Sequence, residues 1–309
     1  MPTPARLADL TARSRRPMMY ADPARAASLG LPPFVRAASS AALVSDALVV
    51  VQDDVHALAR VDLRTALAEP VPLPLAGSLA RSREDKADLE ACALLPDGRL
   101  LVLGSGARPE RRVALAVSME GAAEVLHAGP LFDAIDRALE PLSCATNVEG
   151  VSVLGDAVFF LQRAPGRGDA PCVVLRGDTR EVLGALSTTG AAPSLHARVV
   201  DLGALDGTRV TWTDGVALYG VGLVFTATAE DTSDPVLDGV VKGSFLGLVD
   251  RAGRVSLARL RDVDGAPLTA KVEGLALAGA RAWLVVDPDD EARASDLLDV
   301  PFGVLQPAP

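Results

Sequence analysis

The stretch Asn147-Val148-Glu149-Gly150-Val151-Ser152-Val153-Leu154, followed by the turn residues Gly155-Asp156, contains the pattern from which we predict the fold. It consists of a polar or acidic pair, a small residue and an alternating apolar run, and a second apolar run follows the turn. Alternation with a period of two residues is typical of a β-strand. Two such runs joined by a tight turn predict a β-hairpin.

The same pattern recurs along the chain. Further copies occur at residues 88–95, 213–218 and 272–277, and a degenerate copy at 38–46 has Ser39 where the others have an acid. The marker positions are 39, 90, 149, 214 and 273, so the intervals are 51 to 65 residues long. One propeller blade needs about 40–50 residues, and the excess leaves room for longer loops. The sequence therefore predicts an all-β fold, a β-propeller with five blades, or six if one blade lacks the marker. A β-sandwich with similar hairpins is the alternative.

We expect residues 1–309 to form a single propeller domain. Residues 1–34 precede the first copy and are expected to help close the ring, with 7–11 and 297–305 as the candidate pairing segments. Residues 131–139 have helical spacing, which predicts a short helical insertion near 130–140.

Composition excludes several classes of protein. The formal net charge of −10 opposes binding to the phosphates of nucleic acids and to an anionic membrane surface. The start of the sequence lacks the apolar region of a secretory signal, so we expect a cytoplasmic protein. Three cysteines without CxxC spacing indicate neither a disulfide framework nor a zinc site. We therefore expect no nucleic-acid or membrane partner.

In a propeller, the first strand of each blade lines the axis and the second returns antiparallel beside it. The start of the first strand and the end of the second therefore lie at the same face, and both are polar in this sequence. Side chains two residues apart share a face, which groups Asp88 with Glu90, Asn147 with Glu149 and Lys271 with Glu273. Of the 30 Lys and Arg residues only three are lysines, and two of them, Lys86 and Lys271, lie just before a marker acid.

Carboxylates that converge on an axis repel one another, so a positive group is expected among them. Oxygen ligands without His or Cys favour a hard divalent cation such as Ca²⁺ or Mg²⁺. The candidate metal ligands are Asp88, Glu90, Asn147, Glu149, Asp214 and Glu273. The candidate catalytic residues are Glu149, Glu273, Lys271, Lys86 and Arg163. The alternative is that each acid caps its own strand by accepting backbone N–H bonds, and that the lysines lie there by chance.

The ordered repetition of Asn147-Val148-Glu149-Gly150 and Lys271-Val272-Glu273-Gly274, together with Asp88-Leu89-Glu90-Ala91, resembles bacterial cytosolic β-propellers akin to the phytase-type esterase-like and SdiA-regulated proteins. The resemblance covers roughly residues 36 to 300. It implies a propeller with its site on one face, sometimes with bound calcium. Relatives of this kind are described as esterase-like.

Two functions follow from this pattern. The first is a metal-assisted hydrolase of phosphate or carboxylic esters, in which one carboxylate is the general base. The second is a non-catalytic propeller that binds a small ligand or a protein partner on the same face. A Ser-His-Asp enzyme is disfavoured because His56, His127 and His196 lie outside the repeat. No nucleotide or redox cofactor is expected, since the sequence lacks a phosphate loop and a dinucleotide fingerprint.

Overall fold

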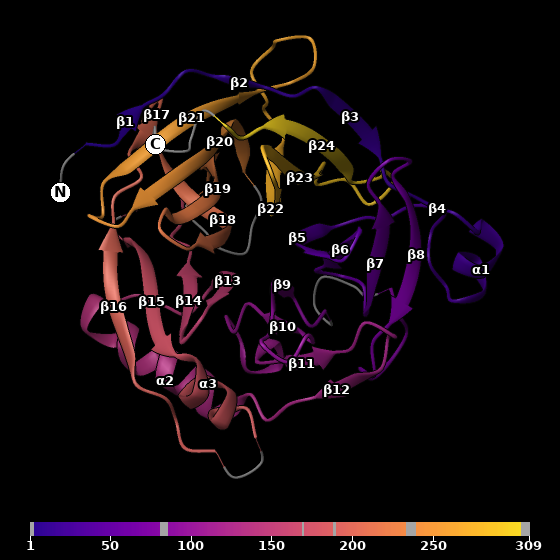
Figure 1. Ribbon diagram of the computed structural model, residues 1–309, viewed down its shortest axis with the longest axis horizontal. Coiled ribbons are helices and arrows are strands. Elements are labelled where there is room, and N and C mark those ends of the chain that lie inside the picture. Colours follow the sequence, from indigo (N-terminus) through magenta and orange to yellow (C-terminus); the bar gives the residue numbers. More distant parts are fainter. Residues whose placement is uncertain (1–2, 81–85, 169, 188–189, 233–238, 304–309) are drawn as a thin grey trace.

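The computed structural model describes residues 3–80, 86–168, 170–187, 190–232 and 239–303. Within these residues the strands form five sheets, which are arranged around a common centre (Figure 1). In each sheet the hairpin of one sequence repeat lies near the centre, and the strands that follow this hairpin lie farther out. The all-β, propeller-like fold is confirmed.

The sheets are numbered here in chain order. Sheet 1 contains β5 (Ala38–Val44), β6 (Ala47–Gln52), β7 (Ala57–Asp62), β8 (Leu67–Pro72) and β4 (Met19–Tyr20). Sheet 2 contains β9 (Leu89–Leu94), β10 (Leu100–Gly104), β11 (Ala114–Val117) and β12 (Ala123–Val125). Sheet 3 contains β13 (Val148–Leu154), β14 (Ala157–Gln162), β15 (Cys172–Asp178) and β16 (Leu195–Val200). Sheet 4 contains β17 (Ala204–Leu205), β18 (Thr208–Leu218), β19 (Gly222–Asp231), β20 (Val240–Asp250), β21 (Val255–Arg261), β1 (Ala5–Arg6) and β2 (Leu10–Thr11). Sheet 5 contains β22 (Lys271–Ala278), β23 (Arg281–Asp287), β24 (Asp296–Pro301) and β3 (Ser14–Pro17).

Sheet 4 differs from an ordinary four-stranded blade. It has seven strands, and β18, β19 and β20 are 11, 10 and 11 residues long. The number of propeller blades therefore stays a prediction, although five repeats and five sheets coincide in the described part of the chain.

Short helices lie outside the sheets. The predicted helical insertion is present as α2 (Gly129–Leu139), which buries Leu131, Phe132 and Ile135. The structure adds α1 (Pro23–Ser28) and α3 (Thr179–Ala185), and the 3₁₀ helices η1 (Pro109–Arg111) and η2 (Glu140–Leu142).

The N-terminal segment runs along the outside of three sheets (Figure 1). β1 and β2 pair in parallel with β21, β3 pairs antiparallel with β24, and β4 pairs in parallel with β8. The sequence places 7–11 against 297–305, whereas the partner of β24 is Ser14–Pro17. Residues 304–305 of that predicted segment lie outside the described residues.

The inner strands are buried on both faces because each sheet packs between two neighbours. All five residues of β10 are buried, as are five of the six residues of β6. Apolar side chains of adjacent sheets form shared clusters, such as the one that joins sheets 3 and 4 around Trp212 and Phe225. The rings of these two residues meet edge to face at a centroid distance of 5.2 Å. This packing fixes the inner hairpins and thereby positions the polar residues at their ends.

Candidate functional site

Every inner hairpin contains a β-bulge, which lies at the marker position of the repeat in sheets 1, 2, 3 and 5 and one residue before it in sheet 4. In sheet 3, Val148 pairs with Gln162 and Gly150 pairs with Leu161, so Glu149 is the extra residue between them. The same register shift occurs in the other four hairpins. The extra residues are Ser39, Glu90, Glu149, Thr213 and Glu273. A bulge leaves one residue out of the ladder and redirects its side chain, which explains why the acids can face the channel.

The bulge also explains the small residue that follows each acid. A Cβ atom on Gly274 would lie 2.8 Å from the backbone nitrogen of Ala41 and 2.5 Å from the Val285 side chain. A Cβ atom on Gly150 would lie 3.2 Å from the Cα of Asp214. Neighbouring sheets therefore approach so closely at the axis that the position after the bulge favours glycine.

Asp214 lies apart from the other predicted ligands, and this position differs from the one that the sequence predicts. It follows the bulge residue Thr213 and is therefore equivalent to Gly150 and Gly274, one position later than the marker acids. One residue along a strand turns the side chain to the other face. Its carboxylate accepts from the backbone nitrogens of Gly215 at 2.7 Å and Leu275 at 3.0 Å, and from Ser40 Oγ at 3.1 Å. Asp214 thus ties sheet 4 to sheets 5 and 1.

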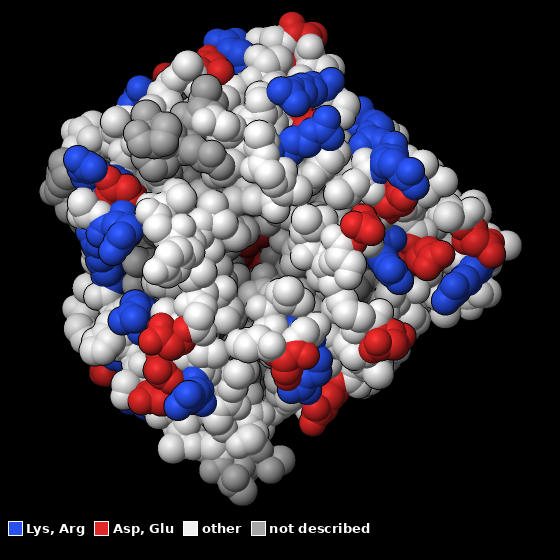
Figure 2. All heavy atoms as spheres, in the orientation of Figure 1, with Lys and Arg blue, Asp and Glu red and all other residues white. Residues whose placement is uncertain are grey.

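The bulge residues of sheets 1, 2, 3 and 5 line a cavity of about 270 Å³ at the end of the channel where the first strands begin. Ten carboxylates and five cationic side chains line it. The carboxylates are Asp53, Asp54, Asp88, Glu90, Glu149, Glu273, Asp287, Asp289, Asp290 and Glu291, and the cations are Arg36, Lys86, Arg111, Arg163 and Lys271. In a view along the axis, the centre of the ring is hollowed, with acidic atoms visible at the bottom (Figure 2).

Lys86 joins the acids of sheets 1 and 2. Its Nζ pairs with Asp53 and lies 2.8 Å from Asp88 Oδ1. The second oxygen of Asp88 accepts from Ser105 Oγ at 2.5 Å and from Arg111 at 2.8 Å. Although burial raises the pKa of Asp88, Lys86, Ser105 and Arg111 together lower it below its ordinary value. Asp88 is therefore held as a carboxylate.

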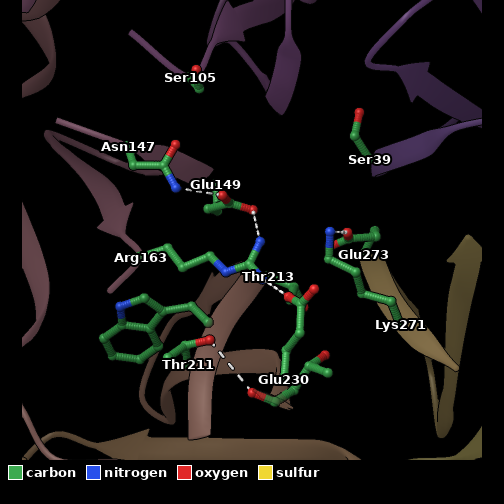
Figure 3. Close-up of polar contacts among 12 residues, drawn as sticks. Ser39, Ser105, Asn147, Glu149, Arg163, Thr211, Thr213, Glu230, Lys271 and Glu273 are labelled. Carbon is green, nitrogen blue, oxygen red and sulfur yellow. Dashed lines mark hydrogen bonds and ion pairs between the residues drawn. The ribbon is translucent and has the colours of Figure 1, made fainter. Parts of the chain in front are cut away.

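Arg163 joins the acids of sheets 3 and 4. One of its terminal nitrogens lies 3.3 Å from Glu149 Oε2, and the other pairs with Glu230 (Figure 3). Glu149 and Glu230 are 4% and 1% exposed, so this guanidinium is their counter-ion in a site with little solvent. Asn147 donates to the remaining oxygen of Glu149 at 2.8 Å, as their predicted common face requires.

Lys271 and Glu273 form a third pair, with Nζ and Oε1 2.6 Å apart (Figure 3). Burial raises the pKa of Glu273 to about 7, and Lys271 and Arg163 act against this rise. The other oxygen of Glu273 is buried and accepts no hydrogen bond from the described residues. An unsatisfied buried carboxylate oxygen is costly, so a site that contains one is suited to a ligand that supplies a positive group.

Glu90 is the second carboxylate of the cavity that could accept further hydrogen bonds or bind a cation. Within the described part of the chain its carboxylate accepts no hydrogen bond, although the charge of Lys86 acts on it. Burial raises its pKa well above the ordinary value, and the nearby Asp88 and Glu149 add to the rise. Asp88 and Glu90, two residues apart, thus have pKa values that are pushed in opposite directions. Such a pair is a common feature of sites with acid–base or ion-binding chemistry.

The residues that the sequence missed are those outside the repeat. Arg111 is buried at the end of η1, and Arg36 pairs with Asp54 at 2.5 Å in the connection before β5. Asp53 follows the second strand of its hairpin and pairs with Lys86, a contact that the repeat does not indicate. No recurring motif marks these positions, so their contacts could be found only from the fold.

The fold and the cavity define a propeller-like protein with a carboxylate-rich pocket at one end of its channel. The chain belongs to the family of unknown function DUF6929, whose profile matches residues 34–301. None of the helices among the described residues has the length and hydrophobicity of a membrane-spanning helix. No curated protein matches the sequence.

Solved structures are similar to the chain at low identity. The glutaminyl cyclase of Myxococcus xanthus matches with 12% identity and a TM-score of 0.49, over 96% of this chain and 97% of that one. A putative glycoside hydrolase from Bacteroides ovatus matches with 12% identity and a TM-score of 0.49, over 96% and 95%. A streptogramin B lyase matches with 11% identity and a TM-score of 0.45, over 93% and 97%. The likeness to the phytase-type and SdiA-regulated propellers stays a prediction.

Proposed function

We propose that the cavity binds a hard divalent cation, Ca²⁺ or Mg²⁺, and uses it in the hydrolysis of a phosphate or carboxylic ester. One observation carries the proposal: carboxylate oxygens of Asp53, Asp88 and Glu90 lie within 4.8 Å of one another. Three converging carboxylates and no nitrogen or sulfur ligand suit a cation that prefers oxygen. In this proposal the five sheets are the five blades of the propeller, and Asn147, Glu149 and Glu273 line the same cavity.

Lys86 is the internal competitor of such a cation. Its ammonium already pairs with Asp53 and Asp88, so a divalent ion has to displace it or bind beside it through Glu90. Because the pKa of Glu90 is raised, cation binding is expected to release a proton from this group. Lysine can leave such a site easily because its flexible stem lets the ammonium swing aside.

The chemistry that follows is general acid–base catalysis beside a Lewis acid. A bound divalent cation supplies activation of water and polarisation of the ester oxygen. Glu273 has a pKa of about 7, which suits it to accept a proton from the attacking water near neutral pH. Lys271 and Arg163 lie beside it and can stabilise the negative charge that develops on the ester.

The alternative is a non-catalytic site for a small ligand with a positive group. It is favoured by the ion pairs of the cavity, because Lys86, Arg163 and Lys271 all have carboxylate partners already. Fold alone does not imply chemistry. In both cases the partner is a small molecule or ion, and the cytoplasmic location stays a prediction.

Calorimetric titration with Ca²⁺ and Mg²⁺ after chelation tests the proposal. Glu90→Gln is expected to weaken binding at least about tenfold, because it removes the carboxylate of the three that accepts no hydrogen bond within the described residues. Lys86→Met is expected to strengthen binding, because the competing ammonium is lost. Glu124→Gln, which changes an exposed glutamate of β12, is the control and should leave the affinity unchanged.

The same proteins decide between the two functions. Cation-dependent turnover of a phosphate or carboxylic ester that is lost in Glu90→Gln and Glu273→Gln supports the hydrolase. Cation binding without turnover of any ester in a broad panel supports the binding protein. If the wild type binds neither ion, or if Glu90→Gln binds as tightly as the wild type, the cation site is wrong.

A further inference from the structure

A second cavity lies between sheets 3 and 4, at the opposite ends of their strands. It has a volume of about 520 Å³, and its walls include the last residue of β13, Leu154, and the last two of β18, Ala217 and Leu218. The carboxylate cavity lies at the other end of β13, where Asn147 and Glu149 line it. Sheets 3 and 4 are neighbours in the ring (Figure 1). The groove between them is thus distinct from the site described above.

The walls of this groove are apolar. Leu154, Phe159 and Val174 line it from sheet 3 and are only partly buried, while Leu223 and Val249 line it from sheet 4. Both volume and lining are typical of a site for a small organic ligand. An apolar surface of this kind that is left open to solvent is unusual on a protein that does not use it.

The rim of the groove is basic, although the chain carries a net charge of −10. Arg176, Arg198 and Arg251 line it and are exposed. In the described part of the chain, none of these three arginines forms an ion pair with a carboxylate. The acid among the lining residues, Asp250, is already paired with Arg254 at 2.7 Å. These arginines can therefore bind an anionic group of a ligand in the groove.

Sheet geometry places two of these cations, Arg176 and Arg198, on the same face of sheet 3 as the apolar wall residue Val174. Arg176 pairs with His196 and Val174 with Arg198 across β15 and β16, so all four side chains share one face of sheet 3. Arg198 reaches across to sheet 4, where a Cβ atom on Gly253 would lie 1.7 Å from its guanidinium. The glycine leaves room for the arginine, which holds its charge over the groove.

We infer that this groove binds a small amphipathic anion, an aliphatic carboxylate. The alkyl chain packs against Phe159, Val174 and Leu223, and the carboxylate accepts charge-assisted hydrogen bonds from Arg198 and its neighbours. Charge complementarity selects this ligand over a neutral or cationic one of the same shape. The inference is independent of the cation site.

Titration of the full chain with decanoate, decan-1-ol and decylammonium tests it. Decanoate is expected to bind at least tenfold more tightly than decan-1-ol, and decylammonium more weakly than either. Arg198→Gln should weaken decanoate binding about tenfold and leave decan-1-ol unchanged. Arg60→Gln, an exposed strand arginine of sheet 1, is the matched control and should change neither.

Variants that fill the groove form the second part of the binding experiment. Val174→Trp, or Ala217→Leu if the first variant does not fold, should abolish binding of both decanoate and decan-1-ol. Three results overturn the inference: no decanoate binding at millimolar concentration, equal affinity for the acid and the alcohol, or decanoate binding that survives the filled groove.

Discussion

Replacing Arg163 with methionine is expected to lower the free energy of unfolding by about 3–5 kcal/mol, because it leaves two buried carboxylates without their counter-ion. Arg163 is the shared partner of Glu149 and Glu230. Methionine fills a similar volume, so the loss is electrostatic rather than a cavity effect. Protonation neutralises the carboxylates that have lost Arg163. The difference in the free energy of unfolding between the variant and the wild type should therefore shrink as the pH falls. Urea unfolding at several pH values measures both effects.

A matched control is available in the same part of the molecule. Arg167 pairs with Asp231 in a fork-like geometry, but its side chain is 62% exposed. Exposed ion pairs contribute little, so Arg167→Met should leave the free energy of unfolding nearly unchanged. The triple variant Arg163→Met, Glu149→Gln, Glu230→Gln should regain most of the stability. If the two single arginine variants lose the same amount, the buried network is not what stabilises this end of the channel.

Replacing Asp214 with leucine is also expected to lower the free energy of unfolding by about 3–5 kcal/mol. The change deprives the backbone nitrogens of Gly215, Leu275 and Ala41 of a buried acceptor, and an unpaired buried N–H is expensive. Asp214→Asn keeps one acceptor oxygen and should lose less. Thermal and urea unfolding of the two variants give the comparison.

This variant also separates a structural role from a ligand role. Folded Asp214→Asn protein should bind Ca²⁺ or Mg²⁺ as the wild type does, because Asp214 lies outside the cavity. A loss of cation affinity equal to that of Glu90→Gln would show that Asp214 is a ligand after all, as the sequence pattern suggests.

Much of this architecture can be predicted from the sequence because the repeat has a physical cause. Glu149-Gly150 and Glu273-Gly274 recur because each bulge turns an acid toward the channel and each close sheet contact favours a glycine after it. The cavity accordingly brings together all the predicted site residues except Asp214. The error at Asp214 has the same cause, since an acid one position after the bulge cannot be distinguished by composition from an acid on it.

Other features depend on contacts that no pattern in the sequence encodes. The pairing of Ser14–Pro17 with β24 joins segments from opposite ends of the chain and involves a short polar strand. Arg111 reaches Asp88 from a 3₁₀ turn, and Lys86 bridges Asp53 and Asp88 across two sheets. Long-range ion pairs of this kind follow from the way the sheets are placed, which only the folded structure supplies.

The position of a bound cation decides whether Asp53, Asp88 and Glu90 form a metal site. Anomalous diffraction from crystals soaked in Mn²⁺, which shares the oxygen preference of Mg²⁺, would locate the ion without any assumption about activity. We predict a peak bounded by Asp53, Asp88 and Glu90, with the Lys86 ammonium displaced. A peak confined to the outer acids Asp290 and Glu291, or the absence of any peak in the cavity, would show that these three carboxylates do not hold the cation.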